Sequence, residues 1–444
     1  MAEETTRLMP SSTGQRDFAH VAAPTLTTLI GAVQAILLLL FLGGSTYSRD
    51  DYSPAEYIIF RDIMVMLLLG FGFLMTFLKK YGLGAVGLTL LLSVLAIQMN
   101  VFAELGARFV HSLFTGVQEE DAVLPLPIGM STMIDGEFAA ATLLISYGAV
   151  LGRASPVQLV IMAIGQAVFY AINKAVFVLG ILGAEDVGGS MTIHLFGALF
   201  GLAASFALGA PRHASSSSNA QPSAVSDVFA LIGTTLLWVF WPSFVSATES
   251  AVPAYTSRCV LHTVLALLGS TAAAFYMSVK KCHGKLDPVH LANSTLAGGV
   301  AVGSSARLGM TPGGALALGV LAGVVSVYGY VYLTPKLEKS CHVYDTCGVG
   351  NLHGLPGMLG GLGSVVFVVL DPHAPFLQYG VVAQCARQIL AVACTVAIAI
   401  GSGLLTGLVM AKSTGGKDAD FEPYDDAVWF EGPYFEVEAQ HAKV

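Results

Sequence analysis

Two stretches of the chain, far apart in the sequence, share a pattern of residue types that could handle protons. The first reads DVGGSMTIH from Asp186 to His194, and the second reads DTCGVGNLH from Asp345 to His353. Both follow D-x-x-G-x-x-x-x-H, and in both a glycine stands seven residues after the histidine. Because imidazole can donate and accept hydrogen bonds near neutral pH, two such groups suit a polar or proton-relaying station.

Other chemistry for these histidines is disfavoured. No further histidine, cysteine or carboxylate stands at metal-ligand spacing beside them, so we expect no metal site and no cofactor. No activated serine or cysteine motif accompanies them, so we expect no enzyme. The six cysteines form no CxxC pair, and we interpret them as small buried apolar side chains rather than disulfides or metal ligands. They are Cys259, Cys282, Cys341, Cys347, Cys385 and Cys394.

The segments that must position the two histidines are strongly apolar. Of the 444 residues, 11% are charged and 55% are hydrophobic, and the mean hydropathy is +0.71. A soluble domain is about a quarter charged, and this chain has too few polar groups to cover a water-facing surface. The composition therefore excludes a cytosolic enzyme, a disordered protein and, with no basic patch carrying aromatics, a nucleic-acid partner. The lipid bilayer remains.

Twelve apolar segments, found with a window of about 19 residues, are long enough to cross a bilayer. We expect an all-α polytopic membrane protein with a channel domain over 24–411 and two halves joined near 211–224. Residues 1–23 form an N-terminal segment, and 412–444 form an acidic tail. The twelve segments are 24–44, 57–78, 83–104, 128–152, 157–182, 188–210, 225–247, 255–279, 287–309, 313–334, 347–371 and 383–411.

The basic residues orient these segments. Fourteen of the 21 lysines and arginines fall in segments on the side of the N-terminus, whereas only Arg49 and Arg108 fall in loops on the other side. This positive-inside bias predicts that both termini are cytoplasmic. The tail carries eight acidic residues between Asp418 and Glu438, interleaved with aromatic residues. It is either a solvated tail or, as the aromatic residues favour, a segment that docks on the cytoplasmic face.

This orientation gives the repeat a geometry. Five segments separate the two histidine-bearing helices, so these helices enter the membrane from opposite faces. Eight residues at a rise of 1.5 Å place each histidine about 12 Å inside a core of about 30 Å. The arrangement predicts an inverted-topology repeat with its site between the repeats. We interpret Asp186 and Asp345 as caps at the helix mouths rather than as substrate contacts. Alternatively each histidine only bonds a neighbouring helix, which their matched depth disfavours.

Several long motifs resemble the Rh branch of the Amt/Mep/Rh ammonium transporter family. They are IDGEFAAATLLISYGAVLGRASPVQLVIM, GGSMTIHLFGALFGL, LLWVFWPSF, KLDPVHLANSTLAGGVAVG, YVYLTP and DTCGVGNLHGLPGMLGGL. The match is dense over 134–363. The resemblance implies an Rh-type ammonia channel in the plasma membrane. It also implies a homotrimer with a pore and twelve spans in each subunit, and ammonium or ammonia as the substrate.

The resemblance also implies roles for particular residues. The twin histidines of the family pore fall on His194 and His353, and the stacked phenylalanines that close the outer vestibule fall on Phe138 and Phe244. The paired aspartates are structural. The implied mechanism is that ammonium loses a proton at the outer vestibule and crosses as ammonia. Desolvation energies favour this order. Moving a bare cation into a dry pore costs on the order of tens of kcal/mol, whereas moving ammonia there costs only a few.

One departure from the family concerns the outer vestibule. Where Rh members commonly carry an Asn-Glu pair, this chain has Asn173 and Lys174. A lysine at that depth repels ammonium, so we hypothesise that Lys174 pairs with Glu137, a candidate cation attractor, and leaves the vestibule near neutral. A neutral vestibule raises the alternative of a carbon dioxide channel. An ammonium sensor is a further alternative, disfavoured by the absence of a long signalling domain.

Overall fold

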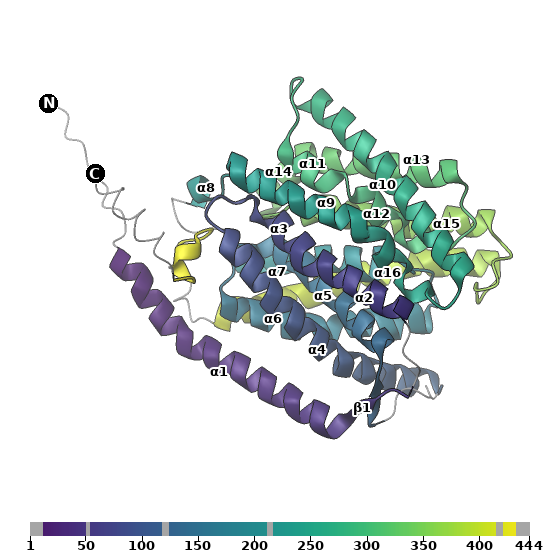
Figure 1. Ribbon diagram of the computed structural model, residues 1–444, viewed down its shortest axis with the longest axis horizontal. Coiled ribbons are helices and arrows are strands. Elements are labelled where there is room, and N and C mark those ends of the chain that lie inside the picture. The colour runs from purple at the N-terminus through teal and green to yellow at the C-terminus, as the bar shows by residue number, and fades with distance from the viewer. Residues whose placement is uncertain (1–11, 50–53, 118–123, 211–215, 414–420, 432–444) are drawn as a thin grey trace.

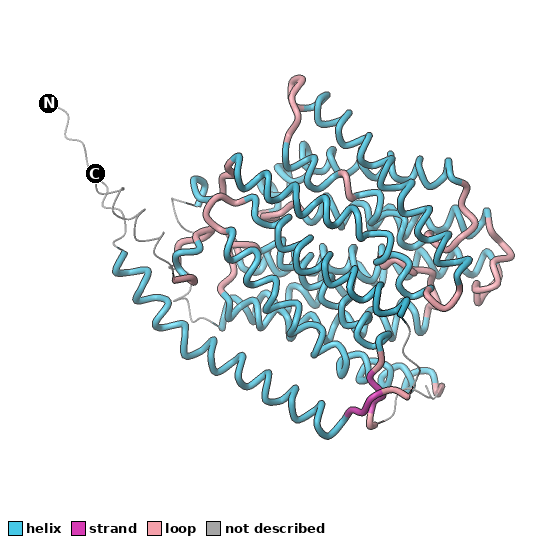
Figure 2. The backbone as a smooth tube through the Cα atoms, viewed as in Figure 1, coloured by secondary structure: helices cyan, strands magenta, loops and turns pink. Residues whose placement is uncertain are grey.

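The computed structural model describes residues 12–49, 54–117, 124–210, 216–413 and 421–431. Helices packed side by side make up nearly all of these residues (Figure 1). The strands described are one short parallel pair, β1 Ser45–Tyr47 and β2 Leu126–Ile128, drawn in magenta in Figure 2. The all-α membrane architecture predicted from the sequence is therefore confirmed.

Eleven helical segments are long and apolar enough to cross a membrane. Several of them combine an α-helix with a π-helical or 3-10 segment, and the elements are labelled accordingly. They comprise α1 Ser12–Gly44, α2 Pro54–Val65, η1 Met66–Phe71, α3 Gly72–Leu74, η2 Met75–Phe77, α4 Gly82–Thr115, α5 Met130–Val150, α6 Pro156–Ala171, η3 Ile172–Ile181, η4 Ser190–Leu195, α7 Phe196–Leu208, α9 Ala224–Ser246, η5 Ala247–Glu249, α10 Pro253–Lys281, α13 Pro312–Tyr328, η7 Gly329–Leu333, α14 Thr334–Cys341, η8 Gly350–Gly354, α15 Leu355–Leu370 and α16 Val381–Ser413.

The segment predicted as the ninth span is not one continuous helix. It is divided into α11 Pro288–Ser294, α12 Ala297–Val302 and the 3-10 turn η6 Gly303–Ser305. Glycine and serine are poor helix formers, and the sequence ANSTLAGGVAVGSS is rich in both. A broken helix is tolerated at membrane depth when protein surrounds it, and α12 is buried along its whole length.

The first helix extends beyond its predicted limit. Because α1 begins at Ser12, the expected boundary between the N-terminal segment and the first span falls inside a helix. Figure 1 shows α1 running along the edge of the bundle. Its side chains Leu39 and Leu42 are 70% and 74% exposed, as expected for a helix that faces lipid on most of its surface.

The loops alternate between two faces. On one, which we call the tail face, Asp426 of the tail donates its backbone N–H to the carbonyl of Lys80, and Tyr424 donates to that of Gly152. The Asp426 carboxylate accepts the N–H groups of Leu83 and Gly84 at the start of α4, both at 2.6 Å. Of the two interpretations of the tail, docking therefore holds for residues 421–431 (yellow turn η10 Asp426–Val428, Figure 1).

The cysteines differ from the expectation. All six are free, but Cys259 alone is fully buried, and Cys341 is exposed. The reason is position: Cys341 ends α14, and Cys282 directly follows the last residue of α10. Both therefore lie at helix ends on the tail face, where packing is incomplete.

Candidate functional site

The two repeats build the same local structure around their histidines. Gly189 and Gly348, the glycines of the D-x-x-G pattern, have φ angles of +70° and +73°. Glycine adopts this left-handed conformation without the steric cost that a side chain adds. The chain then turns into a short π-helical segment, η4 or η8, which carries His194 or His353. Such segments often mark functional sites.

The two aspartates hold the mouths of these segments. Asp186 accepts the backbone N–H of Thr192 at 2.8 Å and the hydroxyl of Ser304 at 2.5 Å, and Asp345 accepts the N–H of Gly350 at 2.8 Å. This is helix-capping geometry, as we interpreted it from the sequence. Burial raises the pKa of both carboxyls above the ordinary range, that of Asp345 to about 6, although the N–H groups oppose the shift.

The later glycine of each repeat permits close helix packing. A Cβ on Gly201 of α7 would lie 2.7 Å from the Cα of Ser146 in α5. A Cβ on Gly360 of α15 would lie 2.7 Å from the hydroxyl of Ser190. Helices α7 and α15 therefore approach their neighbours without a side chain between them, which brings the two π-helical segments together.

The two histidines meet directly. Their Nδ1 atoms are 3.1 Å apart, and the rings are nearly parallel, with 10° between planes and 5.2 Å between centroids. Both side chains are buried, at 0% and 2% exposure. One Nδ1 must carry the proton of this hydrogen bond and the other must accept it, so the neutral pair holds opposite tautomers. One outer Nε2 is then an acceptor and the other a donor.

Aromatic rings surround the pair. Trp241 stacks on His194 at 5.6 Å, and Phe71 stacks on His353 at 6.2 Å. Neither Trp241 nor Phe71 was predicted as a site residue. Trp241 had a signal in the sequence, because it precedes Phe244 by three residues and so shares its helix face; Phe71 had none.

Phe138 and Phe244 lie together next to this aromatic group. Their centroids are 5.0 Å apart at 82°, which is an edge-to-face contact rather than the stack that the resemblance implied. Both rings are buried, and Phe244 also lies 5.9 Å from His194. Phe138 lines a cavity of about 190 Å³ on the face opposite the tail. We call this space the outer cavity.

Charged side chains line the outer cavity unevenly. Four carboxylates face two basic groups, which gives a formal charge of −2. Arg307 binds Glu185 through two nitrogens, with a shortest distance of 2.7 Å, and Glu249 at 2.9 Å. Burial raises the pKa of Glu185, and Arg307 opposes that shift. The six charged residues are Asp135, Lys174, Glu185, Asp186, Glu249 and Arg307.

Lys174 does not pair with Glu137, so that hypothesis is wrong. Its Nζ lies 2.7 Å from Asp135 and 3.3 Å from Glu104, and Glu104 also binds Arg108 at 2.9 Å. Asp135 and Glu137 are two residues apart on α5, about 200° around the helix, so one lysine cannot reach both. Glu137 is 0% exposed, and its oxygens have no hydrogen-bond partner within the described residues.

A second cavity of about 210 Å³ opens near the tail face, and we call it the inner cavity. Asp345 lines it, as Asp186 lines the outer cavity, so each repeat contributes its aspartate to one mouth. The other charged residue of the inner lining is Asp227. Pro288 and Val289, at the start of the broken helix, form part of its wall.

Three comparisons relate the chain to known proteins. A family model described as "Ammonium Transporter Family" matches residues 27–425. The chain is 40% identical to "Ammonium transporter Rh type B" of Danio rerio, over 85% of this chain and 83% of that protein. It is 38% identical to the Homo sapiens protein of that name, over 92% of each.

Solved structures show the same fold. A structure described as "Nitrosomonas europaea Rh50 and mechanism of conduction by Rhesus protein family of channels" superposes with a TM-score of 0.72 at 34% identity, over 88% of this chain and 96% of that one. Saccharomyces cerevisiae Mep2 shares the fold at a TM-score of 0.65 and 16% identity, over 79% of this chain and 83% of that one. The Danio rerio relative is named as a transporter and the Nitrosomonas europaea protein as one of a family of channels, and neither is named as an enzyme.

Proposed function

Since the chain belongs to the Ammonium Transporter Family, and within it to the Rh branch, we propose that it conducts ammonia. In this proposal ammonium enters the outer cavity, gives a proton to external water beside Phe138 and Phe244, and crosses as the neutral molecule past His194 and His353. The chain is a multi-pass integral membrane protein. We further propose that it lies in the plasma membrane with both termini cytoplasmic, as a homotrimer with one pore in each subunit.

The charge of the outer cavity supports recruitment of a cation. Its lining has a formal charge of −2, so ammonium is attracted there although Lys174 is present. The two phenylalanine rings follow along the proposed path, and the π-face of an aromatic ring attracts a cation by roughly 0.5–2 kcal/mol. The cavity thus offers ammonium a place to stop before it sheds its water and its proton.

The observation that carries the proposal is the buried histidine pair. Within the described residues neither imidazole bonds a carboxylate, and the Nε2 of His194 is buried without a partner. A cation here would lose its hydration without compensation, at a cost on the order of tens of kcal/mol. Ammonia needs only a donor and an acceptor, and the opposite tautomers of the pair supply one of each.

Stopped-flow measurements on proteoliposomes with an internal pH dye test the proposal. Ammonium should raise the internal pH faster in wild-type vesicles than in empty ones. His194→Ala and His353→Ala each leave the other imidazole without its partner and should slow the flux at least about fivefold, the effect of one lost buried hydrogen bond. His373→Ala, at an exposed histidine in a loop, is the matched control and should leave the flux unchanged.

Two results would contradict the proposal. If ammonium flux is no faster than in empty vesicles, the protein does not conduct ammonia. If a current proportional to ammonium concentration is measured under voltage clamp, the conducted species is the ion and not neutral ammonia. Carbon dioxide stays the alternative substrate, although the lining charge of −2 removes the added support that a neutral vestibule gave it. A carbon dioxide gradient in the same assay tests it directly.

A further inference from the structure

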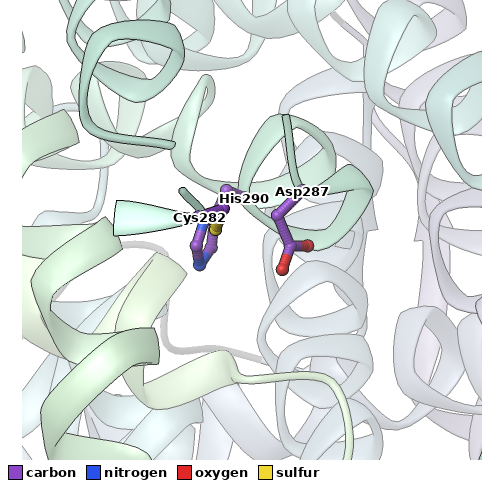
Figure 3. Close-up of side chains that lie close together, drawn as sticks. All are labelled: Cys282, Asp287 and His290. Carbon is purple, nitrogen blue, oxygen red and sulfur yellow. Dashed lines mark hydrogen bonds between the residues drawn. The ribbon is translucent and has the colours of Figure 1, made fainter. Parts of the chain in front are cut away.

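A cluster of potential metal ligands lies outside the proposed conduction path. Cys282, Asp287 and His290 each place a ligand atom within 4.8 Å of the other two. They lie where α10 ends and α11 begins, and Figure 3 shows their side chains extending in the same direction. In the described chain this is the one cluster of at least three such side chains. No motif spacing in the sequence had indicated it.

Local hydrogen bonds hold these side chains in place before any metal binds. The hydroxyl of Ser278 accepts the backbone N–H of Asp287 at 2.9 Å and lies 3.3 Å from Nδ1 of His290. The same Nδ1 lies 3.8 Å from the sulfur of Cys282. Ser278 therefore fixes the turn that carries the aspartate and lies against the imidazole ring.

The distances between the ligand atoms fit a tetrahedrally coordinated ion. Zinc bonds of about 2.0–2.3 Å place neighbouring ligand atoms about 3.3–3.8 Å apart. The sulfur-to-imidazole distance of 3.8 Å already agrees. The other ligand atoms lie within 4.8 Å of one another, so they need to approach by about 1 Å at most. Asp287 uses Oδ1 to accept the N–H of Val289 at 2.8 Å, which leaves Oδ2 for the ion.

Two of the three neighbouring lysines contact other side chains, and the third, Lys285, is exposed. Lys281 donates to the hydroxyl of Tyr332 at 2.9 Å, and Lys280 lies over the ring of Tyr276. The last carbonyls of α10 carry the partial negative charge of a helix end. The position therefore favours a bound cation despite three lysines nearby in the sequence.

We propose that Cys282, Asp287 and His290 form a binding site for a divalent metal ion of the zinc class. A thiolate, an imidazole and a carboxylate select zinc over magnesium or calcium, which prefer oxygen ligands alone. Water completes the fourth position. The ion links the end of α10 to the first turn of α11, next to Pro288 and Val289, which line the inner cavity. Cys282 then acts as a ligand and not only as an apolar side chain.

Cobalt titration of the full-length purified protein tests this site, after removal of bound metal with a chelator. Wild type should bind one cobalt ion per chain, with the thiolate-to-cobalt absorption band of a tetrahedral site, and zinc should abolish the band. Cys282→Ser should lose the band. Cys341→Ser, which removes an exposed cysteine at another helix end, should keep it. Asp287→Asn keeps a good helix cap and should weaken binding at least about tenfold.

Thiol labelling gives a second readout that does not depend on the variants. Zinc should protect Cys282 of the wild type from maleimide while Cys341 stays reactive. The proposal is overturned by a wild type without a cobalt–thiolate band, by wild-type affinity in Cys282→Ser, or by equal labelling of Cys282 with and without zinc. None of these readouts depends on ammonia conduction.

Discussion

Lys174→Met removes the one positive charge that the fifth span places beside the outer cavity. The substitution keeps an unbranched apolar stem but leaves Asp135 without the ion pair it makes at 2.7 Å. Glu104 keeps Arg108 at 2.9 Å. Two effects follow, one on stability and one on the recruitment of ammonium, and a second substitution separates them.

The loss of stability depends on the Asp135 carboxylate, which Lys174→Met leaves without an ion-pair partner. At an effective dielectric of about 20, charges 2.7 Å and 3.3 Å apart attract by about 6 and 5 kcal/mol before desolvation is subtracted. Breaking a buried pair costs about 3–5 kcal/mol net. Because the Asp135 side chain is 28% exposed and can hydrate, we expect about 3 kcal/mol. Lys174→Met with Asp135→Asn removes the stranded charge and should restore most of this loss.

The recruitment effect is set by the net lining charge. Lys174→Met changes the formal charge from −2 to −3, Asp135→Asn changes it to −1, and the double variant returns it to −2. One unit charge about 6–8 Å from a cation in water is worth about 0.5–0.7 kcal/mol. Initial ammonium flux at low concentration should therefore rise about twofold to threefold in Lys174→Met, fall equally in Asp135→Asn, and match wild type in the double variant.

Stopped-flow flux at low ionic strength measures recruitment, and thermal unfolding followed by fluorescence measures stability, in the same four preparations. Salt should compress the flux differences, because it screens the lining charge. A double variant that follows Lys174→Met in flux refutes the charge argument. A double variant no more stable than Lys174→Met refutes the stranded-carboxylate argument.

Three further predictions concern the tail and the repeat. Asp426→Ala removes a cap at the start of α4, worth about 1 kcal/mol, so hydrogen exchange of the Leu83 amide should quicken about fivefold; an unchanged rate contradicts docking through this carboxylate. Gly348→Ala forces a side chain into a left-handed conformation against a tyrosine ring and should destabilise the protein by at least about 1–2 kcal/mol. Gly313→Ala, whose added Cβ would meet its nearest neighbour at an ordinary 4.0 Å, should not. Burial raises the pKa of Asp345 to about 6, so the folded state binds its proton more tightly and wild type should gain up to about 3 kcal/mol relative to Asp345→Asn as the pH falls from 7 to 4; equal pH profiles in thermal unfolding contradict this shift.

The repeat was predictable because its parts act locally. Helix rise, capping preference and the backbone freedom of glycine are properties of a few consecutive residues, so the spacing in D-x-x-G-x-x-x-x-H already placed the caps and brought His194 and His353 to matched depth. The partners of Lys174 were not predictable. Asp135 and Glu104 stand 39 and 70 residues away, and helix periodicity does not state which faces of separate helices meet.

The broken ninth span shows a second limit of prediction from the sequence. Average hydropathy over 287–309 reports only that the segment avoids water. The division into α11 and α12 occurs at two residues, Thr295 and Leu296, and an average over the segment does not register so short an interruption. The edge-to-face contact of Phe138 and Phe244 likewise depends on side-chain rotamers that no residue pattern encodes.

The paired aspartates have a consequence for the direction of transport. The inner cavity is lined by two carboxylates and no basic side chain, and the outer cavity by four carboxylates and two basic groups. Both mouths thus carry a formal charge of −2. In the proposed mechanism the molecule that crosses between them is neutral, so these charges gather ammonium at either mouth but do not drive movement through the pore. The concentration gradient alone then sets the direction of net flow, and the same pore is open to uptake and to release.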